Sequence, residues 1–318
     1  MVATTQVSAQ SHSEDTVIEV QDLSFSYPGI DGRPLPGVPP VVQNMTVSIA
    51  RGSRCLLIGP NGAGKTTLLK ALAGKHMVTQ GSVLVADHSP FHHTELTTSG
   101  DLAYLGGNWV RDIAFAGYSI PLQGDFPAGR MIDGVPGVPA ERKALLTKVL
   151  DVDPEWRMHR VSDGQRRRVQ LLLGLLQPFK VLFLDEITVD LDVLGRADLL
   201  AFLQDECEQR HATIIYATHI FDGLESWPTH LIYLSGGRLQ LFAPTAELPE
   251  MHDLGLLKLV ERWLRKGKQQ RKQAEQQAGV KQHPEARPVS ALPQWSNGYA
   301  PGRLTSSLKD SSNAVMRM

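Results

Sequence analysis

The chain contains 318 residues, 42% of them hydrophobic, and its formal net charge is −1. This length suggests about two domains, or one large α/β domain with an appendage. The near-zero net charge disfavours a global field for nucleic-acid binding, so such a contact would need a local basic patch. The longest apolar runs, such as residues 171–176, are far shorter than the roughly 20 residues that a bilayer requires.

The cysteines, the N-terminal residues and a basic run near the C-terminus indicate the cellular compartment in which the protein is expected. Cys55 and Cys207 lie in apolar or helical contexts and favour a reducing compartment. Residues 1–16 lack the cationic and apolar regions of a secretory signal, so we expect a cytoplasmic protein. The basic run at residues 262–272 could be a nuclear address or an RNA contact, but such runs are more often solvated helix ends. A nuclear location is therefore a second expectation, and direct nucleic-acid binding is not expected.

In chain order, the pattern is that of an α/β protein. The expected strands are residues 17–25, 41–49, 54–58, 181–184, 213–217 and 231–234, and the expected helices are residues 66–72, 141–150, 162–176 and 193–210. Buried apolar strands that alternate with helices imply a parallel sheet covered on both faces. Residues 29–40 hold four prolines and three glycines and are expected to form a loop or insertion. Residues 107–140, also rich in glycine and proline, are expected to be irregular.

The pattern changes near residue 250. Leu256, Val260, Trp263 and Leu264 have helical spacing. Residues 265–318 are first basic and then of low complexity, with few large apolar side chains. Such a segment cannot bury enough surface to offset the entropy of ordering it, so we expect it to be mostly disordered.

A glycine-rich segment, GPNGAGKT, follows the apolar run at residues 54–58 and precedes a helical pattern. It matches G-x-x-x-x-G-K-[ST], the phosphate-binding loop, in the strand-to-helix context that this loop requires. Its backbone N–H groups and the helix start can converge on phosphate oxygens. We expect Lys65 to reach the β- and γ-phosphates and the Thr66 hydroxyl to ligate Mg²⁺. The predicted phosphate-binding residues are Gly59, Pro60, Asn61, Gly62, Ala63, Gly64, Lys65, Thr66 and Thr67.

The apolar run at residues 181–184 ends in two carboxylates, Asp185 and Glu186. An acid at the carboxyl end of a parallel strand lies at the sheet edge where phosphate loops also lie. We expect Asp185 to hold the Mg²⁺ shell and Glu186 to orient and deprotonate an attacking water. An apolar run followed by Asp-Glu is common by itself, so this assignment depends on its place behind the other motifs.

A third motif, Val161-Ser-Asp-Gly-Gln165, lies between the first two. Ser162 is a good N-cap for a helix whose start can receive a phosphate. The three motifs in this order resemble those of ABC ATPases, whose signature is L-S-G-G-Q, and the resemblance covers roughly residues 17–243. It implies that the γ-phosphate is clamped from another chain by Ser162, Asp163, Gly164 and Gln165.

Further residues fit the same resemblance. Tyr27 looks like the aromatic residue that stacks on adenine, with a core tyrosine as the alternative. Asp192 looks like the end of the D-loop, and His219 resembles the switch histidine that contacts the γ-phosphate. The resemblance implies ATP and Mg²⁺ as cofactors and an ATPase activity, with Glu186 and His219 as catalytic residues. We expect this activity to be slow.

The resemblance also implies a fold: an α/β P-loop NTPase of ABC type, with a mostly parallel core sheet, an antiparallel β-subdomain and a helical subdomain. The corresponding division of the chain is a disordered N-terminus (1–15), the ABC ATPase domain (16–245), a C-terminal helix (246–264) and a tail (265–318). Within the ATPase domain, the helical subdomain covers about residues 108–176 and the insert covers residues 29–40.

Two departures from the family pattern affect the functional reading. Where most transporters carry a glutamine that moves with the membrane partner, this chain has Gly107, followed by Asn108. Glycine cannot ligate a metal, which argues against coupling to a membrane domain. Asp163 replaces the second signature residue and brings a carboxylate near a bound phosphate, where like charges would weaken binding unless the side chain points away.

A narrower resemblance is to the small non-intrinsic ABC proteins of plants and fungi, a group that includes a factor associated with the Ccr–Not complex. Segments such as LGGNWVRDIAF and YATHIFDGLESWPTH carry it. It implies an ATP-dependent dimer switch, homo- or heteromeric with another ABC protein, that acts on a soluble regulatory complex and has no fused membrane domain. The alternative is the ATP-binding subunit of a transporter with separate membrane subunits. A third reading, a nucleotide-binding scaffold with negligible turnover, is disfavoured by Glu186 and His219.

Overall fold

A computed structural model describes residues 15–29, 31–106, 112–115, 118–121, 126–189 and 191–277. The chain divides into two compact units, Met1–Gln269 and Gln270–Met318. The second unit contributes only the end of the last helix to the described residues, so the fold is that of the first unit. The disorder expected for the N-terminus and for most of the tail concerns residues outside the described ranges.

The central sheet is mixed, with five parallel strands and one antiparallel edge strand among the described residues. In spatial order its strands are β11 (Arg238–Pro244), β10 (His230–Ser235), β3 (Arg54–Ile58), β9 (Thr213–Ala217), β8 (Val181–Asp185) and β5 (Leu102–Gly106). Every residue of β8 and β9 is buried, as expected for strands covered on both faces. Alternate side chains of β8 enter two different cores, so Phe183 and Leu184 point to opposite faces of the sheet.

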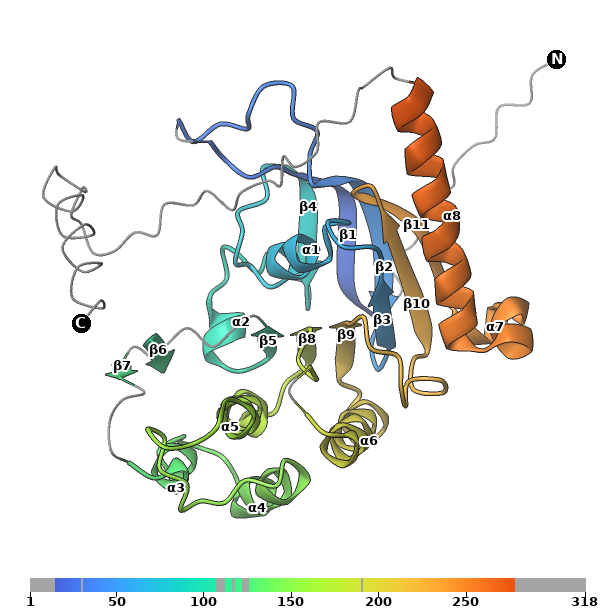
Figure 1. The fold of residues 1–318 in the computed structure, drawn as a ribbon. Helices are drawn as coiled ribbons and strands as arrows, with labels where there is room; N and C mark the ends of the chain where they lie inside the picture. Colours follow the sequence, from blue (N-terminus) through green and yellow to red (C-terminus); the bar gives the residue numbers. More distant parts are fainter. Residues whose placement is uncertain are drawn as a thin grey trace, which may run out of the picture. The chain divides into compact units, whose positions relative to one another are not determined.

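A second sheet is antiparallel, with the order β2 (Val42–Ala50), β1 (Thr16–Phe25) and β4 (Gln80–Val85). Helix α1 (Lys65–Leu72) contacts β4 of this sheet as well as β8 and β9 of the central sheet (Figure 1). Its buried Leu68 and Leu69 join the same core as Ile18 of β1 and Phe183 of β8. The described part of the segment between β1 and β2 is a loop, as predicted from its prolines, with a bridge between Pro28 and Pro34.

The helical subdomain contains α3 (Ala128–Asp133), α4 (Ala140–Val149) and α5 (Asp163–Leu176), which pack on one another. The prediction that residues 107–140 are irregular is wrong for α3 and for a short hairpin, β6 (Asp112–Phe115) and β7 (Tyr118–Pro121). Proline and glycine have local roles there. Pro127 directly precedes α3, where its missing N–H costs nothing, and a Cβ on Gly129 would lie 3.0 Å from the Pro154 side chain. The expected α/β architecture, with a mostly parallel central sheet, an antiparallel sheet and a helical subdomain, is found in the structure.

The remaining described helices are α2 (Glu95–Thr98), α6 (Val193–Arg210), a short 3₁₀ turn at Thr245–Glu247, α7 (Pro249–Leu254) and α8 (Leu256–Gln277). Helix α8 continues past residue 264, where composition placed the start of the tail. Arg, Lys, Gln and Glu are good helix formers without burying apolar surface, so a lack of hydrophobic side chains does not end the helix. Among the described residues, none of the helices combines the length and apolar character needed to cross a membrane.

A buried ion pair links the helical subdomain to the core. Arg142 of α4 donates to both carboxylate oxygens of Glu206 on α6, at 2.7 and 3.2 Å, and also to the carbonyls of Leu175 and Leu176 at the end of α5. Both charged side chains are less than 10% exposed. A two-point guanidinium–carboxylate contact fixes orientation as well as distance, so this pair sets how α4, α5 and α6 meet.

Glu206→Gln should lower the free energy of unfolding by about 3 kcal/mol, because it leaves the Arg142 guanidinium buried without its countercharge. The matched control is Glu261→Gln, which breaks an exposed pair with Arg265 on α8 and should change stability by less than about 0.5 kcal/mol. Urea unfolding of both variants measures the difference. Equal unfolding midpoints would show that the buried pair does not hold the subdomain in place.

Candidate nucleotide-binding site

The phosphate loop lies between β3 and α1, as its motif predicts. Gly64 is the residue before α1 and has a φ of 97°, a left-handed conformation that favours glycine. A Cβ on Gly59 would lie 2.5 Å from the carbonyl oxygen of Leu234. The backbone at Leu234 therefore leaves no room for a side chain at residue 59. These observations explain why the loop needs glycine at residues 59 and 64, the two fixed glycines of its motif.

Lys65 is the first residue of α1, and its ammonium is bonded to its own loop. Its Nζ donates to the carbonyl of Gly59 at 2.8 Å and to that of Pro60 at 3.4 Å. Burial lowers the pKa of Lys65, and the nearby carboxylates of Glu186 and Asp185 oppose that shift. The ammonium therefore lies among carbonyls and carboxylates at the mouth of the loop, where phosphate oxygens could replace the carbonyls.

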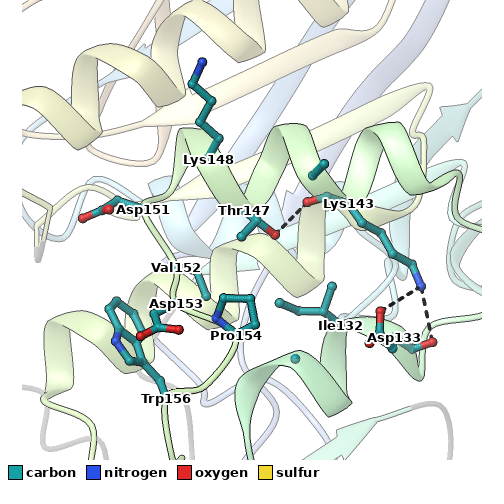
Figure 2. A pocket seen from close by; sticks show the side chains of 12 residues that line it. Ile132, Asp133, Lys143, Thr147, Lys148, Asp151, Val152, Asp153, Pro154 and Trp156 are labelled. Carbon is teal, nitrogen blue, oxygen red and sulfur yellow. Dashed lines mark hydrogen bonds and ion pairs between the residues drawn. The ribbon is translucent and has the colours of Figure 1, made fainter.

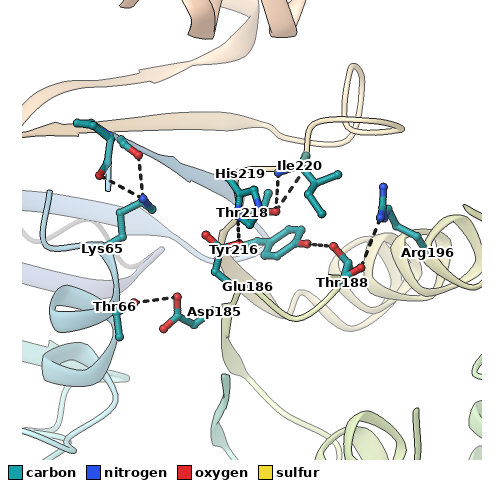
Figure 3. Close-up of polar contacts among 12 residues, drawn as sticks. Lys65, Thr66, Asp185, Glu186, Thr188, Arg196, Tyr216, Thr218, His219 and Ile220 are labelled. Atoms are coloured by element: carbon teal, nitrogen blue, oxygen red, sulfur yellow. Dashed lines mark hydrogen bonds and ion pairs between the residues drawn. The ribbon is translucent and has the colours of Figure 1, made fainter. Parts of the chain in front are cut away.

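The two residues predicted to hold Mg²⁺ meet across the sheet edge (Figure 3). The Thr66 hydroxyl donates to Oδ1 of Asp185 at 3.2 Å. Asp185 is the last residue of β8 and is only 4% exposed. Oxygen ligands on a rigid frame are what Mg²⁺ prefers, so the donor set fits this ion.

Glu186 and His219 also come together, from the ends of β8 and β9. Nδ1 of His219 lies 2.5 Å from Oε2 of Glu186 (Figure 3). The Glu186 N–H donates to the Ala217 carbonyl at 2.9 Å. Glu186 has a φ of 55°, a left-handed conformation that is unusual for a residue with a Cβ. Strained backbone of this kind costs of order 1–3 kcal/mol and persists where neighbouring contacts enforce it.

A buried hydroxyl pair supports the segment after Glu186. The Tyr216 hydroxyl lies 2.7 Å from Oγ1 of Thr188, and Nη2 of Arg196 donates to the Thr188 carbonyl at 3.4 Å. Burial raises the pKa of Tyr216, which keeps its hydroxyl protonated. Sequence reasoning did not single out these three residues, because each is an ordinary core or helix residue until the fold places it behind Glu186.

Sequence reasoning also missed Tyr104, which lies on β5 beside β8. Its hydroxyl donates to Oδ2 of Asp185 at 3.1 Å. Burial and then the charge of Asp185 raise the pKa of Tyr104 above its ordinary value, so the phenol remains a donor. No local sequence signal indicated this contact, because it arises from the pairing of β5 with β8. The neighbouring Gly107 and Asn108, which depart from the transporter pattern, lie outside the described residues.

The signature segment begins α5 on the helical subdomain. Ser162 caps this helix by accepting from the Gln165 N–H at 3.2 Å, and Gln165 Oε1 accepts from the Ser162 N–H at 2.9 Å. The side chain of Asp163 is 94% exposed and pairs with Arg166 at 2.6 Å. Its carboxylate is thus partly neutralised. Within the described part of the chain, the hydrogen bonds of these signature residues do not reach the phosphate loop.

Asp192 and Tyr27 have defined local partners. Asp192 caps α6 through the Gly195 N–H at 2.8 Å and accepts from Arg168 of α5 at 3.1 Å, so the D-loop is tied to the signature helix. The Tyr27 hydroxyl lies 3.0 Å from Oγ1 of Thr67, which places the half-exposed ring beside the start of α1.

A separate pocket of about 620 Å³ lies on the helical subdomain and holds none of the predicted site residues (Figure 2). Its wall combines Ile132 of α3, Thr147 of α4, and Pro154 and Trp156 from the turn between α4 and α5. Lys143 reaches the carbonyl of Asp133 across one rim at 3.3 Å. The nucleotide site is thus assigned by the motif residues and their contacts rather than by the pocket.

Comparison with known proteins gives the family. The model of the ABC transporter domain matches residues 42–189. The Arabidopsis thaliana protein "ABC transporter I family member 20" is 50% identical over 98% of this chain and 99% of its own length. "CCR4-associated factor 16" of Saccharomyces cerevisiae is 39% identical over 70% of this chain and 76% of its length. The solved structure of an ATP-binding subunit of an ABC transporter shares the fold, with a TM-score of 0.61 at 21% identity over 78% of this chain and 99% of that one.

The fold and the ordered motifs are those of an ATP-binding cassette. The chain belongs to the ABC transporter family of P-loop ATP-binding proteins. Within that family it is similar along nearly its whole length to an Arabidopsis ABC transporter I family member, and the resemblance to ABC ATPases expected from its motifs is confirmed.

Proposed function

We propose that this chain binds and hydrolyses ATP in a dimer that opens and closes with the nucleotide. The observation that carries the proposal is the meeting of Thr66, Asp185, Glu186 and His219 at one edge of the central sheet. The phosphate loop begins at the same edge, directly after β3. A nucleotide with its γ-phosphate at this edge would have binding groups and a base within reach.

Binding would use the loop and its flanking residues. Backbone N–H groups of residues 59–67 and the Lys65 ammonium would hold the phosphates, and Tyr27 would stack on adenine. Thr66 and Asp185 would hold Mg²⁺, which supplies positive charge that offsets the charge of the phosphates. The ammonium of Lys65 would exchange the Gly59 and Pro60 carbonyls for phosphate oxygens.

Hydrolysis would depend on Glu186 as the base. Its carboxylate would take a proton from a water whose oxygen forms a bond to the γ-phosphorus, while the bond from that phosphorus to the bridging oxygen breaks and ADP leaves. His219 lies against this carboxylate at 2.5 Å and would orient it and contact the γ-phosphate. These contributions are mainly positioning and charge stabilisation. We propose that turnover is slow, because Asp163 brings a further negative charge near the bound phosphate.

We infer the dimer from the family, because in ABC ATPases the phosphate loop and the signature segment complete a site only across two chains. The chain has one phosphate loop and one signature segment, and the two lie on different subdomains. A complete site would therefore use the phosphate loop of one chain and the α5 start of the partner subunit. The outward, Arg166-paired Asp163 would let Ser162 face the phosphate with less repulsion. The second chain is a copy of this one or another ABC protein.

Glu186→Gln should trap a dimer when ATP and Mg²⁺ are present, because it removes the base but keeps the binding groups. ATP hydrolysis should fall by at least about 100-fold. Size exclusion with light scattering, with and without ATP, measures the trapping. The matched control adds Lys65→Ala, which should return the chain to monomer. A Glu186→Gln chain that stays monomeric with bound ATP would contradict a composite homodimer.

We further propose that the dimer acts on a soluble regulatory protein complex in the cytoplasm or nucleus, rather than on membrane subunits. A relative at 39% identity bears the name of a CCR4-associated factor, which supports a partner of this kind. The pocket beside Trp156 offers a concave surface on the helical subdomain where such a partner could bind.

Affinity purification of the Glu186→Gln chain with ATP and Mg²⁺, followed by mass spectrometry, tests the kind of partner. We expect soluble transcription or mRNA-decay factors, absent from a parallel purification of Lys65→Ala. Recovery of polytopic membrane proteins would support the alternative, an ATP-binding subunit of a transporter, and would contradict the regulatory proposal.

A further inference from the structure

Two hydroxyl groups each donate to a different oxygen of the Asp185 carboxylate. Thr66 of α1 donates to Oδ1 of Asp185 at 3.2 Å, and Tyr104 of β5 donates to Oδ2 at 3.1 Å. A carboxylate with both oxygens bonded has little freedom to rotate. The Tyr104 contact therefore leaves Oδ1 as the oxygen that faces Thr66.

Gly106 makes room for this contact. It pairs directly with Asp185 in the parallel register of β5 and β8. A Cβ at residue 106 would lie 2.6 Å from the Asp185 Cβ and 2.8 Å from the Tyr104 hydroxyl. Any larger residue there would displace the carboxylate, the hydroxyl or both, so the contact between Tyr104 and Asp185 depends on this glycine.

The ring that carries the hydroxyl is itself held in place. Tyr104 packs against the core formed by the antiparallel sheet, α1 and one face of the central sheet. The ammonium of Lys75 lies 5.2 Å from the centre of the ring, within the range of a cation–π contact. Packing of the ring therefore fixes where the Tyr104 hydroxyl lies relative to Asp185.

We propose that Tyr104 is a positioning residue for the magnesium site, acting through Asp185. By bonding Oδ2, it turns Oδ1 toward the Thr66 hydroxyl, and these are the two oxygens proposed to hold the ion. Groups that orient metal ligands in this way commonly change metal affinity by about 10- to 100-fold when removed. The inference rests on the proposed function, since it needs a nucleotide and a metal at this site.

The test is metal affinity rather than turnover. Mn²⁺, which substitutes for Mg²⁺ and whose free ion is counted by electron paramagnetic resonance, is titrated into the full-length chain saturated with ADP. Tyr104→Phe, which keeps the ring, should weaken Mn²⁺ binding by about tenfold. The affinity for ADP in the presence of a chelator should stay unchanged, because Tyr104 does not belong to the phosphate loop.

Tyr233→Phe is the matched control. It also removes a tyrosine hydroxyl that donates a hydrogen bond, here to the carbonyl of Trp263 on α8, and it should leave Mn²⁺ binding unchanged. Gly106→Ala keeps the Tyr104 hydroxyl but removes the space for it, so it should weaken Mn²⁺ binding in the same way. If Tyr104→Phe does not fold, wild-type affinity for Mn²⁺ in a folded Gly106→Ala chain would overturn the inference.

Each outcome bears on one of the two proposals. Wild-type affinity for Mn²⁺ in a folded Tyr104→Phe chain, or an equal loss in Tyr233→Phe, would overturn the positioning role while leaving the proposed function intact. A wild-type chain that binds neither ADP nor nucleotide-dependent Mn²⁺ would overturn the proposed function, and the inference with it.

Discussion

The parallel register of four strands is the constraint on which the candidate site depends. Gly106 pairs with Asp185, Asp185 with Ala217, and Ala217 with Leu57. Because parallel strands end at one edge, the segments that follow them carry the phosphate loop, Glu186 and His219 to the same place. A shift of one residue in β8 would turn Asp185 to the opposite face of the sheet and separate it from Thr66. Successive side chains of β8 are buried in two different cores, and this packing opposes such a shift.

Around this register, neighbouring groups hold the reactive side chains in place. Glu186 keeps its left-handed backbone because its N–H bonds Ala217 and the next segment is held at Thr188 by Tyr216 and Arg196. The same principle operates between subdomains, where one buried ion pair joins α4 to α6 and Arg168 joins α5 to the cap of α6. The start of α6, at Asp192, is therefore linked to the signature helix within one chain.

The sequence predicted the features that depend on local pattern. The strand at Arg54–Ile58, the phosphate loop, the Ser162 cap and α6 are all found where residue spacing placed them. It could not predict contacts that arise from strand order, since nothing local to Tyr104 indicates that it lies next to Asp185. Composition misled the prediction in two places. Pro127 directly precedes α3 and Gly129 lets that helix pack against Pro154, so proline and glycine do not make this segment irregular. Polar helix formers extend α8 to Gln277, beyond the point where apolar residues become rare. The roles of the predicted site residues remain predictions that require a bound nucleotide to test.

If one ATP site needs two chains, hydrolysis must depend on the concentration of the chain. ATP hydrolysis per chain is measured with saturating ATP and Mg²⁺ while the chain is diluted through the range in which it becomes monomeric. We predict that activity per chain rises with concentration and reaches a plateau when the dimer is complete. Activity per chain that stays constant down to fully monomeric protein would contradict it, because Ser162 of the partner subunit would then be unnecessary.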